Sequence, residues 1–308
     1  MAEVVLVAGA SGFIGSHLTR ALVEAGYEVR AMTRRPASYH GAGQPVAGDI
    51  ADPASIDAAA AGTDAAYYLV HSLESEDFRE RDAAGARAFA SACARARLER
   101  VVYLGGLGAD DDRLSPHLAS RREVERLLSA GDVPVTVLRA AVVIGHGGIS
   151  WEMTRQLVDH LPAVVTPRWV NTLTQPIAVA DVIRYLVGVL EPQDAKGRVF
   201  EIGGPEVMRY LDMLQRAAAI RGRPLPNLSV PLLTPRLSSA WLALVTDVDF
   251  ATARNLVDSM TTEVVVHDNA ILDVVPGERI GYDEAVRLAL AERDADPTIR
   301  RGSTGRPS

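Results

Sequence analysis

Residues 4–15, with the sequence VVLVAGASGFIG, decide the fold that we expect for this chain. The five apolar residues Val4–Ala8 predict a buried strand, and the amphipathic pattern that follows predicts a helix over Phe13–Ala25. Three glycines with the spacing G-x-x-G-x-x-G join the two elements. A strand, a glycine-rich turn and a helix, in this order, are the context in which such a spacing indicates a dinucleotide site.

Each glycine of the turn has a separate physical task. Gly9 turns the backbone sharply off the strand, Gly12 has no Cβ that would obstruct a phosphate, and Gly15 lets the helix pack closely on the sheet. Free N–H groups at the start of the helix, assisted by the helix dipole, then hold the phosphates. The residues that we predict to bind the cofactor in this turn are Gly9, Ser11, Gly12, Phe13, Ile14 and Gly15.

The end of the second predicted strand indicates which dinucleotide binds. Residues 31–35 read AMTRR, whereas an NAD site usually presents an acid about 20 residues beyond the turn, to hold the ribose 2′-hydroxyl. Guanidinium groups instead bind a 2′-phosphate. Arg34 and, less strongly, Arg35 therefore predict NADP(H) in preference to NAD(H); the alternative is two solvated arginines on a loop. Residues 48–50 end a further, third strand that precedes Ala65–Val70, and Asp49 and Ile50 there are predicted to contact the adenine.

Apolar runs alternate with helical patterns through the first two-thirds of the chain. The predicted strands are Val4–Ala8, Val29–Met32, Ala65–Val70, Arg100–Leu104, Pro134–Leu138 and Val199–Ile202. The predicted helices between them are Phe13–Ala25, Ala54–Ala61, Asp77–Ala96, Ser120–Ala130 and Asp181–Leu190. This alternation predicts an α/β fold with a doubly wound, mainly parallel Rossmann sheet.

The alternation of strands and helices ends after residues 203–205, and short helices with proline-rich connections follow. The helices predicted there are Tyr210–Ile220, Arg236–Val245, Phe250–Met260 and Tyr282–Glu292. We therefore predict an NAD(P)-binding domain over residues 1–205, of which 146–180 partly contribute to a second lobe. A small, mostly helical C-terminal substrate lobe follows over 206–292, and a flexible tail over 293–308.

Composition excludes several classes of partner. A net charge of −7 disfavours general binding to nucleic acid or anionic membranes. The single cysteine, Cys93, permits no intramolecular disulfide, and together with the lack of a signal peptide it favours the cytoplasm. Residues 224–246 carry one charge, Arg236, but three prolines interrupt them, so we expect a lid or buried segment and no integral membrane span. We expect no metal site, a small-molecule substrate, and a monomer or homodimer.

As a set, several motifs resemble the short-chain dehydrogenase/reductase superfamily, and most closely its atypical members of the YbjT and NmrA-like kind. The matching stretches are Gly9–Gly15, Arg34, Gly48-Asp49, and residues 67–72, 135–145, 175–181 and 200–206. The resemblance implies an extended Rossmann domain with a small lobe over the substrate cleft. It also implies cofactor contacts from Leu69, Val70 and His71 after the fourth strand, and from Ala140 and Val143 near the nicotinamide.

The chain departs from this superfamily at the catalytic residues. Active reductases of the superfamily use a Ser and a Tyr-x-x-x-Lys pair, whereas here the fifth strand has glycine at the Ser position and residues 117–121 read HLASR. His117 is expected either to donate a proton near neutral pH or to cap a helix. Arg121 is expected to stabilise an oxyanion or the ribose, or else to form a surface salt bridge. His71 is a third catalytic candidate, with a structural role as the alternative.

Three residues are candidates for substrate contacts. Tyr67 and Tyr68 lie on opposite faces of their strand, so that at most one of them, taken as Tyr68, lies near the ligand. His146 lies in a glycine-rich loop, and Trp169 either lines a pocket or forms a packing corner.

Three functions remain open from the sequence. The first is an atypical NADPH-dependent reductase of a small, apolar carbonyl or enone. The second is a non-catalytic NADP(H)-binding redox sensor of the NmrA-like type. The third is an NAD(P)-dependent epimerase or dehydratase.

Overall fold

The computed structural model describes residues 3–71, 78–108, 114–160, 164–166, 168–223, 225–229 and 258–297. They form two compact units. The first unit takes its residues from 1–140, 182–202 and 266–277, and the second from 141–181, 203–265 and 278–308. The domain limits given above stay predictions, because compactness alone does not define a folding domain.

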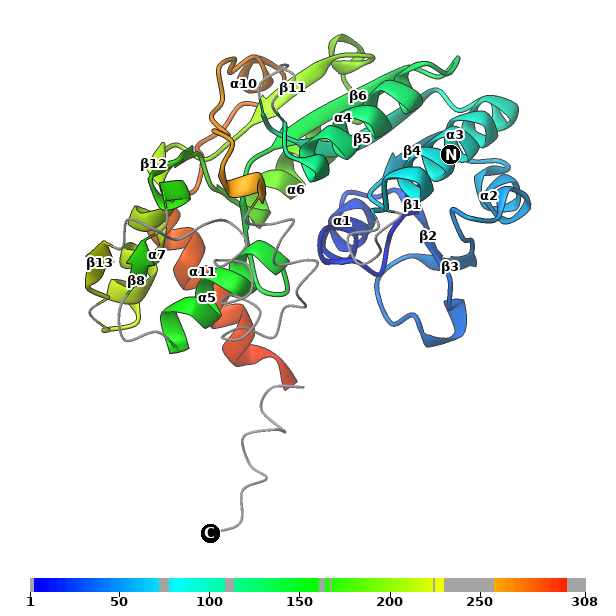
Figure 1. Ribbon diagram of the computed structural model, residues 1–308. Coiled ribbons are helices and arrows are strands. Elements are labelled where there is room, and N and C mark those ends of the chain that lie inside the picture. Colours follow the sequence, from blue (N-terminus) through cyan, green and yellow to red (C-terminus); the bar gives the residue numbers. More distant parts are fainter. Residues whose placement is uncertain are drawn as a thin grey trace. The chain divides into compact units, whose positions relative to one another are not determined.

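Within the described part of the first unit, seven parallel strands form one sheet in the order β11-β6-β5-β4-β1-β2-β3 (Figure 1). The strands are β1 (Val4–Ala8), β2 (Glu28–Thr33), β3 (Gln44–Ala47), β4 (Ala65–Tyr68), β5 (Arg100–Gly106), β6 (Val135–Ala140) and β11 (Val199–Ile202). The order reverses between β1 and β4, and ligands of such sheets bind outside the carboxyl ends of the strands at this point. The predicted doubly wound sheet is confirmed.

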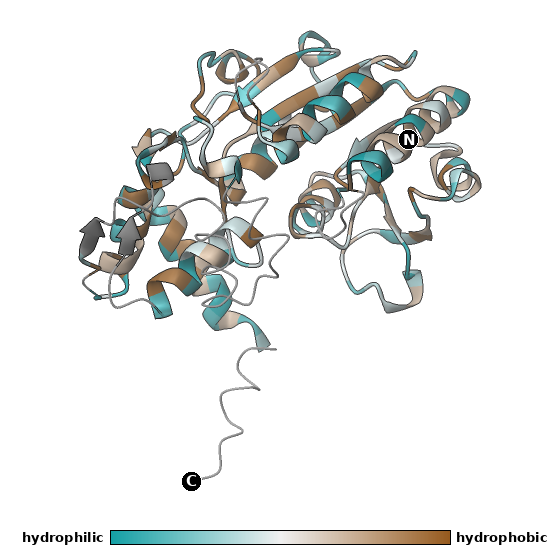
Figure 2. Cartoon of the chain, viewed as in Figure 1, coloured by the Kyte–Doolittle hydropathy of each residue, from teal (hydrophilic) through white to brown (hydrophobic). Residues whose placement is uncertain are grey.

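Helices cover both faces of this sheet. They are α1 (Phe13–Glu24), α2 (Pro53–Ala60), α3 (Phe78–Ala96), α4 (Pro116–Ser129) and α6 (Val179–Gly188), with short helical turns η1 (Pro36–Ser38), η3 (Gln193–Ala195) and α10 (Ile271–Val274). Helices α2, α3 and α4 lie side by side (Figure 1) and share one buried cluster with the strands. Figure 2 shows hydrophobic residues along the strands and hydrophilic ones on the outer helical surfaces.

The side chains of two adjacent tyrosines of β4 point to opposite faces of the sheet. Tyr68 lies in the cluster under α3, with its ring 5.0 Å from that of Phe89. Tyr67 points to the opposite face, where its hydroxyl donates a hydrogen bond to the carbonyl oxygen of Leu186 in α6 at 2.8 Å. Both residues are fully buried.

The described part of the second unit is mostly helical, as predicted. Helices α5 (Ile149–His160), α7 (Tyr210–Ile220) and α11 (Tyr282–Ala295) pack around a buried cluster that includes Trp151, Met213 and Val286. The short elements are β7 (Val143–Ile144), β8 (Val164–Thr166), η2 (Arg168–Asn171), β9 (Leu173–Thr174), β10 (Ile177–Ala178), β12 (Met208–Arg209) and β13 (Asn227–Ser229). The pairs β7–β10 and β8–β13 are parallel, and β9–β12 is antiparallel.

Helix α4 starts earlier than the predicted Ser120. It begins at Pro116, and the Ser115 hydroxyl accepts a hydrogen bond from the Leu118 N–H at 3.2 Å. Serine at the cap followed by proline at the first helical position is a strong helix start. The cap is therefore Ser115 and not His117, which lies within the first turn.

Some sequence predictions lie outside the described residues. They are the helix Arg236–Val245, residues 250–257 of the next predicted helix, most of the proline-rich segment with Trp241, and the tail beyond residue 297. Among the helices that the structure describes, none combines the length and the apolar character needed to span a bilayer.

The two buried tyrosines of β4 generate a matched stability test. Tyr67→Phe removes a hydrogen bond from a buried carbonyl and should lower the free energy of unfolding by about 0.5–1.5 kcal/mol. Tyr68→Phe should leave it unchanged or raise it, because the Tyr68 hydroxyl is buried without a partner among the described residues. Urea denaturation of the two variants and the parent chain measures the difference. Equal destabilisation by both substitutions would contradict this assignment of the two hydroxyls.

Candidate nucleotide-binding site

The glycine turn after β1 packs directly against the segment that follows β4. The Leu69 N–H donates to the carbonyl oxygen of Ala8 at 3.0 Å. Gly9 has a φ of +90°, and a Cβ there would lie 3.1 Å from the Leu69 carbonyl carbon. A Cβ on Gly15 would overlap the carbonyl oxygen of Gly9. Both positions therefore require glycine, one for its φ and both for lack of space.

The start of α1 has little space for a side chain at residue 12, and it has free backbone donors. A Cβ on Gly12 would meet only the Gly9 oxygen, at 3.3 Å. No side chain caps this helix, whereas Asp52 caps α2. Among the described residues, no acceptor binds the N–H groups of Phe13 and Ile14. An uncapped helix start with exposed amides is suited to bind a phosphate.

The two arginines after β2 are exposed to solvent. Neither the Arg34 nor the Arg35 guanidinium has a hydrogen-bond acceptor or counterion among the residues that the structure describes. The loop that follows is held by Tyr39, whose hydroxyl donates to the carbonyl oxygen of Ala42 at 2.8 Å. Two positive charges are therefore available to a ligand at this end of the sheet.

Asp49 and Ile50 lie just beyond β3, and both take part in local packing. The Asp49 carboxylate accepts a hydrogen bond from the Ala51 N–H at 2.9 Å, in the turn that precedes α2. Ile50 lies against α3 at Gly85, where a Cβ would be 3.0 Å from the Ile50 Cδ1. Both residues remain partly accessible, and their contact with adenine stays a prediction.

His71, His117 and Arg121 come together at the carboxyl end of the sheet. His71 follows β4, while His117 and Arg121 lie one turn apart on α4. The Arg121 side chain passes the end of β5, because a Cβ on Gly106 would lie 3.8 Å from the Arg121 Cγ. The Tyr103 hydroxyl of β5 donates to the Arg121 carbonyl oxygen at 3.2 Å.

Both imidazoles of this cluster are held in the neutral form. Burial, followed by the charge of Arg121, lowers the pKa of His117 to about 3. The charge of Arg121 is also the largest cause that lowers the pKa of His71, and we assign the shift to this charge because His71 is exposed. A neutral imidazole offers an N–H as a hydrogen-bond donor. The protein without ligand therefore lacks the imidazolium that proton donation by His117 near neutral pH would need.

The remaining residues predicted to contact the cofactor or the substrate lie in several elements. Leu69 and Val70 are partly buried after β4, and Ala140 ends β6, where its carbonyl oxygen accepts from the Leu107 N–H at 2.8 Å. Tyr68 is enclosed in the core, so we no longer consider it as a substrate contact. Val143 lies in β7 of the second unit.

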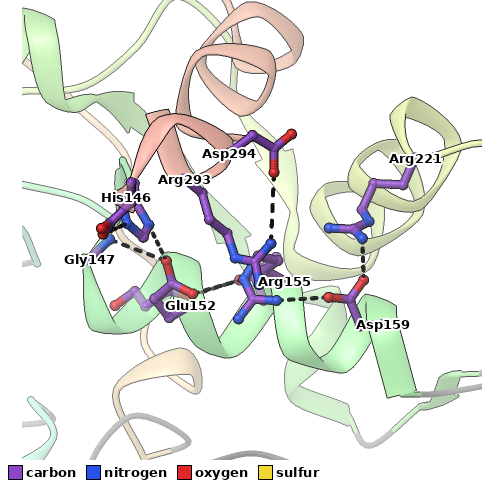
Figure 3. A network of polar contacts seen from close by, with 11 residues as sticks. His146, Gly147, Glu152, Arg155, Asp159, Arg221, Arg293 and Asp294 are labelled. Carbon is purple, nitrogen blue, oxygen red and sulfur yellow. Dashed lines mark hydrogen bonds and ion pairs between the residues drawn. The ribbon is translucent and has the colours of Figure 1, made fainter. Parts of the chain in front are cut away.

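The remaining substrate candidates also belong to the second unit. His146 lies between two carboxylates, with Nδ1 3.1 Å from Glu152 and Nε2 3.1 Å from Asp296. Figure 3 shows how this contact continues through Glu152 to Arg155 and Asp159. His146 thus takes part in a polar network through hydrogen bonds to two carboxylates. The backbone of Trp169 lies in η2, and its side chain is outside the described part of the chain.

The lowered pKa of His117 predicts a dependence of stability on pH. An unfolded histidine has a pKa of 6.5 and the folded one about 3, so between these values the unfolded chain binds a proton that the folded chain does not. The free energy of unfolding is therefore highest above about pH 6.5 and falls as the pH decreases toward about 3. His117→Gln should reduce this fall, measured as the urea midpoint between about pH 7 and pH 5. An identical fall in both proteins would contradict the lowered pKa.

Comparison with known proteins identifies the family. A model of the NAD(P)H-binding family matches residues 9–165. Ceramide reductase of Caulobacter vibrioides is 33% identical over 151 residues, which cover 47% of each chain. The 2-alkyl-3-oxoalkanoate reductase of Stenotrophomonas maltophilia is 30% identical over 171 residues, covering 46% of this chain and 52% of that one. The chain thus spans about half the length of these curated relatives.

Solved structures show the same fold over nearly the whole chain. A nucleoside-diphosphate-sugar epimerase from Staphylococcus aureus superimposes with a TM-score of 0.75 and 14% identity, over 92% of this chain and 99% of that one. At this identity the likeness concerns the fold alone. The family match, the glycine turn and the parallel sheet together show that this chain belongs to the NAD(P)H-binding family, as an atypical short-chain dehydrogenase/reductase.

Proposed function

We propose that the chain is an NADP(H)-dependent oxidoreductase that reduces a small carbonyl or enone with an apolar body. The observation that carries the cofactor preference is the pair of exposed arginines at the end of β2, Arg34 and Arg35, which lack counterions among the described residues. A 2′-phosphate supplies the missing negative charge, and a ribose 2′-hydroxyl does not.

The relatives support reduction as the type of reaction. Both are named as reductases, one of ceramide and one of a 2-alkyl-3-oxoalkanoate. These names share the reaction and differ in the compound reduced, so they support an oxidoreductase without specifying its substrate.

Bound NADPH would supply a hydride to the carbonyl carbon, water would supply the proton for the oxygen, and NADP⁺ and the alcohol would be left. The amides of Phe13 and Ile14 would hold the diphosphate. His117 would donate its neutral imidazole N–H to the carbonyl oxygen, in a hydrogen bond that strengthens as negative charge develops there. His71 would lie next to the same site. These roles need no Tyr-Lys pair.

The cofactor preference has a direct test with a built-in control. Arg34→Ala should weaken NADPH binding by about ten- to hundredfold, because hydrogen bonds to charged groups contribute roughly 1.5–3 kcal/mol each. NADH binding should stay nearly unchanged. Gly12→Ala should weaken both cofactors alike, because its methyl group would occupy space beside the shared diphosphate. Fluorescence titration measures all four affinities. An equal loss of NADPH and NADH in Arg34→Ala would contradict the 2′-phosphate role.

Turnover separates the proposed reductase from its alternatives. NADPH consumption should be detectable on a panel of ketones and enones. It should fall by at least about tenfold in His117→Ala, as expected for removal of a hydrogen bond that strengthens in the transition state. His71→Ala serves as the neighbouring comparison. Tight NADPH binding without turnover on any compound would overturn the reductase.

One observation favours a non-catalytic redox sensor as the second candidate. The sequence contains a single lysine, Lys196, and residue 192 is proline. A Tyr-x-x-x-Lys pair therefore occurs nowhere in the chain. The third candidate, an epimerase or dehydratase, would be supported by oxidised cofactor that stays bound to the protein through purification.

A further inference from the structure

We infer that Arg121 binds an anionic group of the substrate, so that the compound reduced is an oxo acid: an apolar body with a carbonyl and a carboxylate. The inference rests on the proposed function and names the substrate class of the same site. Four properties of the cluster around α4 support it.

Arg121 is a partly buried cation without a counterion. Among the described residues, no carboxylate lies within ion-pair distance of its guanidinium and no carbonyl accepts from it. The Tyr103 hydroxyl engages the backbone oxygen of Arg121 and also lies within hydrogen-bond reach of its side chain, but this hydroxyl is neutral and does not compensate the charge. Keeping a charge away from water without a partner is costly. A site that does so is arranged for a partner that arrives with the ligand.

The acid that would ordinarily neutralise Arg121 is already engaged. Glu125 lies four residues further along α4, the spacing at which helical side chains form ion pairs. Its Oε1 binds the Arg139 Nη2 at 2.6 Å, and its Oε2 binds the Arg139 Nε at 3.1 Å and the Arg122 Nη1 at 3.0 Å. Arg122 also donates to the Gly108 carbonyl oxygen at 2.8 Å. Glu125 is thus shared by Arg122 and Arg139 and does not pair with Arg121.

The groups that face Arg121 from other elements do not compensate this charge. His71 and His117 are neutral, and among the described residues no carboxylate raises the pKa of either imidazole. The nearest acid on α3, Asp82, is buried on the side of Tyr68 and Tyr103 and has contacts of its own. Counted over the residues that the structure describes, His71, His117 and Arg121 thus carry one positive charge, in a chain whose net charge is −7.

The phosphates of the proposed cofactor would leave the charge of Arg121 uncompensated. Its diphosphate would lie at the start of α1, and its 2′-phosphate at Arg34, beyond β2. A substrate carboxylate at Arg121 would also change the neighbouring imidazoles. By compensating the charge of the guanidinium it would remove the second of the two main causes that lower the pKa of His117, so this pKa would rise when the substrate binds.

Binding is tested first, without turnover. Calorimetry on the protein saturated with NADP⁺ should detect hexanoate and give at least about tenfold weaker binding for hexanamide, which lacks the charge. Arg121→Gln should remove this preference, Arg121→Lys should retain part of it, and Arg126→Gln, an exposed arginine on the same helix, should behave as the parent. The NMR-measured pKa of His117 should rise when hexanoate binds. No heat with millimolar hexanoate, or equal affinity for both compounds, overturns the inference.

Turnover provides the second arm, with 5-oxohexanoate and its methyl ester as paired substrates. Arg121→Gln should lower kcat/KM for the acid by about ten- to hundredfold more than it lowers kcat/KM for the ester. Equal losses would overturn the inference and assign Arg121 to the oxyanion or the cofactor ribose. Failure of the proposed function appears differently: no NADPH consumption with any compound, while hexanoate still binds through Arg121.

Discussion

The close approach of α1 to the turn after β1 is the constraint on which the nucleotide end of the first unit depends. A side chain at residue 15 would overlap the carbonyl oxygen of Gly9, and one at Gly9 would press on Leu69. Because both spaces are empty, the first turn of α1 lies at the carboxyl edge of β1, next to the segment after β4. The free amides of the helix therefore open onto the point where the strand order reverses.

Most of the fold could be predicted from local sequence patterns. The limits predicted for β1, β11 and α7 agree with the structure, because each element combines a clear apolar pattern with a distinct turn or cap at its ends. The start of α4 was missed, although Ser115-Pro116 is a recognisable signal for it. The alternation of Tyr67 and Tyr68 follows from the geometry of any strand.

The electrostatic state of the site was not predictable from local sequence. The sequence places His117 and Arg121 one turn apart, but it does not reveal that Glu125 is engaged by Arg139 from β6. That ion pair joins α4 to β6, and it engages the acid that lies one helical turn from Arg121. The neutral form of His117 has a similar origin, since it depends on burial and on a charge one helical turn away.

Charge distribution connects the two ligands of the proposed reaction. NADPH and an oxo acid are both anions, and a chain with an excess of acids repels them on average. In the described part of the chain, arginines without a counterion lie at two separate strand ends of the sheet, Arg34 after β2 and Arg121 beside β5. His71, after β4, lies between these strands in the sheet order and adds a hydrogen-bond donor without further positive charge. In the proposed reaction each anion would have its own cation, one for the 2′-phosphate and one for the substrate carboxylate.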